Sequence, residues 1–288
     1  MVSELQVLQA ADGELGFIAN VTVVGEAIYA SGGTYHRSTW LTSKDGRSFQ
    51  RRNTPPTSGL RGHCVRDSGD IVVVGEYGTV ATTGDEGDTW TCHDTPAPAC
   101  LYRVCEAFGA IWACGDGGVV LRSEDGEQWE QAYRGGGRLL GVFFCQRQLF
   151  FIGDQTLRYD GQTFSKVALS QSAPICAVSE TPNGGLLAVG DRGQLHRSDD
   201  GTSWSALRVG TSADLEDIAT LPGGLLVVGA SGTLLFSDDG DSWAPLEGVE
   251  AREHFWSVAP CDDGVVLGGN RGLMMKLTIE MEEWEDFD

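Results

Sequence analysis

A repeating unit of about 40 residues is the feature that most constrains this chain. The clearest copy is VGDRGQLHRSDDGTSW, from Val189 to Trp204, and it recurs as VVGASGTLLFSDDGDSW, ACGDGGVVLRSEDGEQW and VVGEYGTVATTGDEGDTW, with weaker copies SKDGRSF and YDGQTF. The glycine three residues before each aromatic stands at positions 46, 87, 126, 161, 201 and 240, at spacings of 41, 39, 35, 40 and 39 residues. A period of this length is typical of propellers and solenoids, whose units bury their faces only by stacking.

Each unit contains four short runs of Val, Leu, Ile and aromatic residues, bounded by Gly, Asp, Asn or Pro, which is the pattern of strands. A last copy, VVLGGNRGLMMKLTIEMEEW, keeps the first glycine half and Trp284 but lacks the Asp-Gly turn. No ten-residue helical pattern occurs. Seven units therefore predict an all-β fold, a seven-bladed β-propeller of four-stranded blades. We expect one domain over residues 1–288, with blade-closing turns near 46, 87, 126, 161, 201, 240 and 281.

The two ends of the chain bear on how the ring closes. The segment ELQVLQ near the N-terminus is expected to pair into the last blade beside WEDFD, which would tie the termini together and cover a strand edge. The tail EMEEWEDFD carries six acidic residues. It reads either as a solvated outer strand or as an acidic arm for a partner.

Composition excludes several partners. The chain has 41 acidic and 20 basic residues among 288, a net charge of −21, which argues against nucleic acid or an anionic membrane as the main partner. No apolar run approaches a membrane span, and the start MVSELQVLQAADGELG lacks the features of a signal peptide, so we expect a cytoplasmic protein. None of the eight cysteines forms a C-x-x-C pair, and the five histidines lack metal-site spacing. We therefore expect reduced, structural thiols and no metal or cofactor.

The acids of the repeat are predicted to be structural. An aspartate can accept hydrogen bonds from backbone N–H groups two residues on, the following glycine takes a positive φ, and the aromatic ring can pack between blades. This interpretation covers the acids at these turns, which are Asp45, Asp85, Asp125, Asp160, Asp199, Asp200 and Asp239.

The motif TGDEGDTW, from Thr83 to Trp90, resembles the Asp-box of the bacterial neuraminidase (BNR) repeats. Together with the VGxxG half, the units resemble those of the Ycf48-like photosystem II assembly factors over nearly the whole chain. The resemblance implies a propeller that acts as an assembly platform, with an arginine-bearing patch that contacts its client. In the Asp-box family the Asp-box turns lie away from the catalytic face.

Candidate binding residues cluster where the loops between second and third strands share a face with the starts of the first strands. The turn residues at that face vary from blade to blade, and Trp, Tyr and Arg are the types that dominate binding hot spots. The predicted mouth-face residues are Arg61, Tyr77, Tyr102, Arg103, Arg192, Glu216, His254, Trp256 and Arg271.

The leading functional hypothesis is a non-enzymatic, protein-binding platform that uses this mouth face. One alternative is an acidic immunity-type protein that neutralises a basic toxin by electrostatic capture. Another is a glycan-active hydrolase or a lyase on the same scaffold, with His63 or His254 as the candidate lyase residue. The chain shows no convincing pair of nucleophile and base, so no catalytic residue is predicted.

Overall fold

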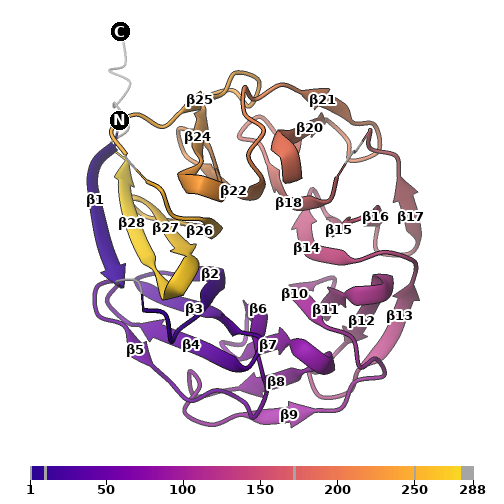
Figure 1. The fold of residues 1–288 in the computed structure, drawn as a ribbon. Helices are drawn as coiled ribbons and strands as arrows, with labels where there is room; N and C mark the ends of the chain where they lie inside the picture. Colours follow the sequence, from indigo (N-terminus) through magenta and orange to yellow (C-terminus); the bar gives the residue numbers. More distant parts are fainter. Residues whose placement is uncertain (1, 10–11, 171–172, 250, 280–288) are drawn as a thin grey trace, which may run out of the picture.

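The computed structural model describes residues 2–9, 12–170, 173–249 and 251–279. Its strands form seven four-stranded antiparallel sheets, arranged as blades around a central axis (Figure 1). The predicted seven-bladed propeller is confirmed. No helix in the described part of the chain is both long and apolar enough to cross a membrane.

The strands follow the sequence order, with the innermost strand first in six blades. Blade 1 comprises β2 (Phe17–Val24), β3 (Ala27–Thr34), β4 (Arg37–Ser43) and β5 (Gln50–Arg51), and blade 2 comprises β6 (Leu60–Val65), β7 (Ile71–Gly75), β8 (Val80–Thr83) and β9 (Thr91–His93). Blade 3 comprises β10 (Leu101–Ala107), β11 (Ala110–Gly115), β12 (Val119–Ser123) and β13 (Glu130–Arg134), and blade 4 comprises β14 (Leu139–Cys145), β15 (Gln148–Gly153), β16 (Thr156–Tyr159) and β17 (Phe164–Val167). Blade 5 comprises β18 (Ile175–Glu180), β19 (Leu186–Gly190), β20 (Gln194–Ser198) and β21 (Ser205–Leu207), and blade 6 comprises β22 (Leu215–Leu221), β23 (Gly224–Gly229), β24 (Leu234–Ser237) and β25 (Ala244–Pro245). Blade 7 comprises β26 (Phe255–Cys261), β27 (Gly264–Gly269), β28 (Met274–Ile279) and β1 (Val2–Gln9).

Five of the turns between second and third strands are three-residue 3-10 helices. They are η1 (Glu76–Gly78), η2 (Asp116–Gly118), η3 (Asp191–Gly193), η4 (Ala230–Gly232) and η5 (Asn270–Gly272). These turns and the starts of the innermost strands form one face of the ring, the mouth face. The Asp-Gly turns and the hairpins between first and second strands form the opposite face, the turn face.

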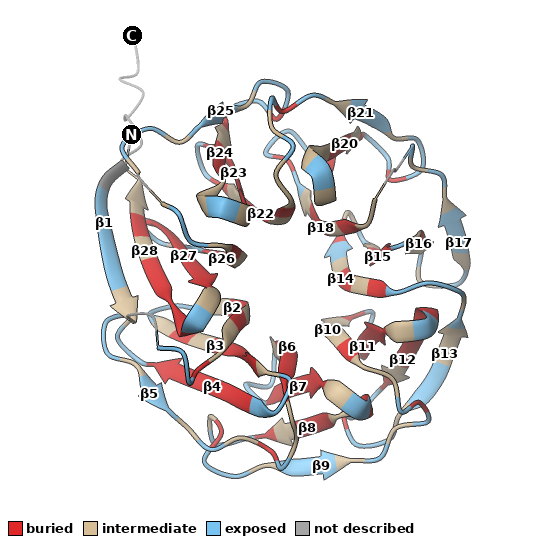
Figure 2. Cartoon of the chain, viewed as in Figure 1, coloured by how far each residue is buried: buried red, intermediate tan, exposed pale blue. Residues whose placement is uncertain are grey.

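Burial explains the composition of each strand. The second strands lie between two neighbouring blades, so β7 (IVVVG) and β23 (GLLVVG) are buried along their whole length. Apart from β1, the outermost strands are short, and they are largely exposed, as in β5 and β9 (Figure 2). A β-rich run that is apolar on both faces can only be covered by blades on both sides, which is what a closed ring provides.

The Asp-Gly turns have a repeated geometry that agrees with the structural interpretation of their acids. Asp200 Oδ1 accepts the backbone N–H groups of Thr202 at 2.8 Å and Ser203 at 3.0 Å. The aspartates at 45, 125, 160 and 239 make the same two contacts in their own turns. Because these N–H groups stabilise the ionised form, they lower the pKa of Asp45 to about 2.

The tryptophans that follow the turns pack between blades, as the pattern predicts. The ring of Trp204 in blade 5 lies edge-on to Phe150 of blade 4, with 6.0 Å between centroids. Its indole N–H donates to the carbonyl of Gly201 in its own turn at 3.1 Å. The ring is half-buried, because the outer strand leaves one edge in solvent.

Ring closure uses the N-terminal segment. Strand β1 pairs antiparallel with β28, with Leu5 opposite Leu277 and Val7 opposite Met275. The N-terminus therefore supplies the outermost strand of blade 7, and the predicted pairing of this segment with the last blade is confirmed. The tail at residues 280–288, including Trp284 and the turn expected near 281, lies outside the described residues.

Candidate binding surface at the mouth of the propeller

The same side-chain hydrogen bond recurs in four blades at the mouth face. The second residue of an innermost strand hydrogen-bonds to the first residue of the 3-10 turn in the same blade. The pairs are Arg61–Glu76, Tyr102–Asp116 at 2.9 Å, Cys176–Asp191 at 3.5 Å and Trp256–Asn270 at 2.7 Å. These side chains hold the turns in place, so they contribute to the fold as well as to the surface. The Arg61 side chain, in its ion pair with Glu76, is only 9% exposed.

The middle residue of each 3-10 turn lies at the tip of the turn, whereas the first residue is held, in four of the five turns, in a contact with the innermost strand. In four blades a residue other than glycine occupies the left-handed region at this position: Tyr77, Arg192, Ser231 and Arg271 have φ of 57°, 60°, 56° and 57°. The equivalent residue of blade 3 is Gly117, with φ of 67°. Tyr77 is 78% exposed, and both arginines are exposed. Neither arginine forms an ion pair with any of the residues that the structure describes.

Aromatic and cationic groups form a continuous cluster across blades 2, 1 and 7. The guanidinium of Arg61 lies 4.9 Å from the centroid of Phe17 and 5.1 Å from that of Tyr35. Phe17 then contacts Trp256 at 5.4 Å between centroids, and Trp256 stacks on His254 at 3.9 Å. Such contacts hold the rings in fixed orientations at the surface.

Blade 6 lacks the hydrogen bond between the innermost strand and the 3-10 turn. The first residue of its 3-10 turn is Ala230, which has no polar side chain, so Glu216 instead bonds to a residue of the next blade. Its Oε1 lies 3.0 Å from His254 Nε2. The pair connects blades 6 and 7 beside Trp256 and orients the imidazole.

The structure brings eight of the nine predicted residues to the mouth face, in two groups. Arg61, Tyr102, Glu216, His254 and Trp256 are packed into side-chain contacts, whereas Tyr77, Arg192 and Arg271 project from turn tips. Arg103 does not lie on the rim. It is the third residue of its strand, and its guanidinium extends inside the ring to Asp217, because the backbone bulge between Leu101 and Arg103 turns this position inward.

Sequence reasoning did not select several residues of this face. Phe17 and Tyr35 complete the aromatic cluster, and a groove of about 640 Å³ beside Tyr77 is lined by His36, Arg37 and the segment at 54–58. The Pro55-Pro56 pair is the sequence feature that could have indicated this groove, because two prolines stiffen an exposed connection. Tyr35 stood in a variable loop, but nothing in the sequence places it over Arg61.

Two observations bear on metal and thiol chemistry at this surface. The described residues contain no group of three His, Cys, Asp or Glu side chains placed to hold a metal ion. Burial raises the pKa of the Cys100 thiol to about 12, and the nearby Glu76 carboxylate adds to that shift. A thiol with so high a pKa is a poor nucleophile at neutral pH.

Comparisons with known proteins define the fold. No family model matches the chain, and no curated protein matches it in sequence. The structure of YCF48 bound to D1 peptide is 18% identical and superimposes with a TM-score of 0.78, covering 96% of this chain and 97% of that one. YCF48 from Cyanidioschyzon merolae is 14% identical, with a TM-score of 0.75 and coverages of 96% and 99%.

A structure of catalytically inactive virginiamycin B lyase from Staphylococcus aureus with quinupristin is also similar. It is 12% identical, has a TM-score of 0.80 and covers 96% of this chain and 99% of its own. Identities this low establish a shared propeller architecture, which serves both binding proteins and an enzyme.

Proposed function

We propose that the protein is a binding platform for another protein and that the contact is made by the mouth face. The observation that carries this proposal is the conformation of Tyr77, Arg192 and Arg271. A left-handed backbone favours glycine, and a side chain there costs about 1 kcal/mol or more. Three exposed tyrosine and arginine side chains at strained positions fit a functional role better than a structural one.

The chemistry of these tips indicates the kind of partner segment. Tyrosine supplies rigid apolar area, and an arginine without an internal ion pair can form bidentate bonds to a carboxylate. The groove beside Tyr77, with a volume of about 640 Å³, offers room for side chains of an extended segment. The similar propeller YCF48 was solved with a bound peptide, which supports the same kind of partner for this chain.

The test uses the strain itself. A triple variant, Tyr77→Gly, Arg192→Gly and Arg271→Gly, removes the three side chains and relieves the left-handed backbone, so it should fold and melt at or above the wild-type temperature. Ser231→Gly is the matched control, because it relieves the fourth tip without removing a large side chain. Both proteins and the wild type serve as baits in host-cell extract, with quantitative mass spectrometry.

We expect proteins that the wild type and Ser231→Gly capture equally and that the triple variant loses. Titration of the purified partner should then show a loss of about 2 kcal/mol or more in binding free energy. A triple variant that captures every partner as the wild type does would refute the mouth face as the contact. If affinity for that partner then fell steeply with salt, the acidic exterior of the chain would be the contact, as a toxin-neutralising protein requires.

A second candidate function is a lyase reaction at the same face. The observation that favours it is the 3.0 Å contact between His254 and Glu216, since a carboxylate that orients an imidazole is a common arrangement for a general base. Incubation with quinupristin, followed by mass spectrometry, tests it directly. Conversion that His254→Ala abolishes would establish the lyase, and an unchanged substrate would eliminate that reaction.

A further inference from the structure

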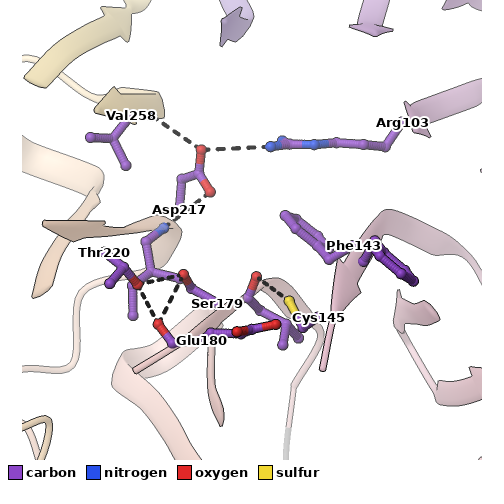
Figure 3. Close-up of a pocket in the computed structure, with 11 residues that line it drawn as sticks. Arg103, Phe143, Cys145, Ser179, Glu180, Asp217, Thr220 and Val258 are labelled. Atoms are coloured by element: carbon purple, nitrogen blue, oxygen red, sulfur yellow. Dashed lines mark hydrogen bonds and ion pairs between the residues drawn. The ribbon is translucent and has the colours of Figure 1, made fainter. Parts of the chain in front are cut away.

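A cavity of about 380 Å³ lies within the ring on the side of the turn face, away from the mouth residues described above. It lies among the innermost strands of blades 3 to 7, and its wall is shown in Figure 3. Its lining residues are Arg103, Phe143, Phe144, Cys145, Val178, Ser179, Glu180, Asp217, Ile218, Thr220 and Val258.

The third residue of each innermost strand explains why this side is hollow. In blades 6 and 7 this residue carries a polar side chain that accepts a backbone N–H from the innermost strand of the next blade. In blade 1 the equivalent residue after the same bulge is the fourth of β2, and its side chain does the same. The pairs are Asn20 with His63 at 3.1 Å, Asp217 with Val258 at 3.1 Å and Ser257 with Val21 at 3.0 Å. In blades 4 and 5 the equivalent residues are Gly141 and Ala177, which fill little space.

Arg103 lies at the deep end of the cavity, and its guanidinium N–H groups donate no hydrogen bond to a described residue. Its guanidinium extends to Asp217 of blade 6, but the 3.7 Å separation exceeds a hydrogen bond (Figure 3). It also lies 4.8 Å from the centroid of Phe143. The side chain is only 20% exposed, and no described residue accepts a hydrogen bond from the guanidinium. The guanidinium has five N–H donors, and leaving them without acceptors in a half-enclosed site costs free energy. A ligand with oxygen atoms would supply those acceptors.

Asp217 lies too far from the guanidinium to accept a hydrogen bond from it. Its Oδ1 accepts the N–H of Ile218 at 3.0 Å, and its Oδ2 accepts that of Val258, so the carboxylate is held to the backbone of two blades. The pairing leaves Arg103 facing the open volume. A carboxylate on a ligand would match the planar guanidinium with two parallel hydrogen bonds.

The remaining charges favour a ligand that also carries a positive group. Glu180 stands at the rim, where one carboxylate oxygen accepts the N–H of Gln146 and the other faces no cation among the described residues. With Asp217 and Glu180 against Arg103, the lining has one excess negative charge, in a chain with a net charge of −21. A simple anion would add to this repulsion, whereas an ammonium group near Glu180 would offset it.

We propose that this cavity binds a small apolar zwitterion, an amino acid or a dipeptide with free ends. Its carboxylate pairs with Arg103, its ammonium group lies near Glu180, and its side chains contact Phe143 and Val178. Arg103 is the third residue of β10 and Glu180 is the sixth residue of β18, an offset of three residues that corresponds to about 10 Å along a strand. That separation favours the dipeptide.

Calorimetric titration with four probes tests the proposal: Leu-Leu, leucine, 4-methylpentanoate, which has only the carboxylate, and 3-methylbutylamine, which has only the amine. We expect Leu-Leu to bind most tightly. Arg103→Met should weaken both zwitterions by about tenfold or more, and Glu180→Gln should weaken them without weakening 4-methylpentanoate. Arg208→Met and Glu127→Gln make the same charge changes outside the cavity and should leave every affinity unchanged.

Two results would overturn the proposal: no saturable heat with any probe at millimolar concentration, or Leu-Leu affinity that Arg103→Met leaves intact. If Arg103→Met fails to fold, Ser179→Leu provides the second variant, because it fills the cavity and touches neither charge. Leu-Leu binding that survives this variant would likewise place the ligand elsewhere. None of these measurements depends on the mouth face, so the two proposals fail independently.

Discussion

Gly62 tests how closely the innermost strands of blades 2 and 3 approach each other. A Cβ atom at Gly62 would lie 2.7 Å from the carbonyl oxygen of Tyr102 and 3.1 Å from the Cα of Arg103. Both are backbone atoms of the next blade, so neither can move aside as a side chain would. Gly62→Ala must therefore separate two blades or strain the strand, at a cost of about 1–3 kcal/mol.

Gly136→Ala is the matched control. Gly136 has nothing within 4 Å of an added Cβ and does not have a positive φ. Alanine there should stabilise the fold by about 0.4–1 kcal/mol, because it restricts the unfolded chain. The same chemical change is thus expected to have opposite signs at two sites.

Differential scanning calorimetry measures both variants. For a chain of 288 residues the unfolding entropy is about 0.6 kcal/mol per degree, so Gly62→Ala should lower Tm by about 2–5 °C. Gly136→Ala should raise Tm by about 1 °C. A Gly62→Ala protein that melts at or above the wild-type temperature would show that the blades do not approach as described.

Three further predictions concern closure of the ring and pH. Deleting residues 2–9 should lower Tm by several degrees, since β28 then becomes an uncovered edge; an unchanged melting curve would mean that β1 contributes nothing to closure. Burial lowers the pKa of His63 from 6.5 to about 3, so the folded state stays neutral while the unfolded state takes up a proton. Stability should therefore fall as the pH drops below about 6.5, by up to about 1.4 kcal/mol per unit, and urea titrations of His63→Gln should show a flatter dependence. Hydrogen bonds from Thr89 lower the pKa of Asp85 from 3.8 to about 2, so its contribution is present above pH 4 and lost as the pH falls through 2. The Tm difference between wild type and Asp85→Ala should shrink over that interval, and a constant difference would contradict the assignment.

The repeat alone was enough to predict the architecture. A unit that recurs about every 40 residues, with an Asp-Gly turn in five copies and an Asp-Glu-Gly turn in a sixth, indicates the positions of the turns and the order of the strands. The role of Asp200 followed from the same regularity, because a residue that returns with the period of the fold belongs to the fold. The pairing of the N-terminal segment with the last blade was also predicted, although beside WEDFD, which lies outside the described residues.

Contacts between blades were decided only by the tertiary structure. Arg103 and Asp217 lie 114 positions apart in the sequence, on blades 3 and 6, and no local pattern shows that one reaches the other. The bulge that turns Arg103 inward, and the small residues Gly141 and Ala177 that leave the cavity open, act together only when seven strands meet at one axis. The sequence by itself determined the period and therefore the blades, because those depend on local turns and strand patterns. The orientation of each third-position side chain depends on its neighbours in the closed ring, and the structure alone shows it.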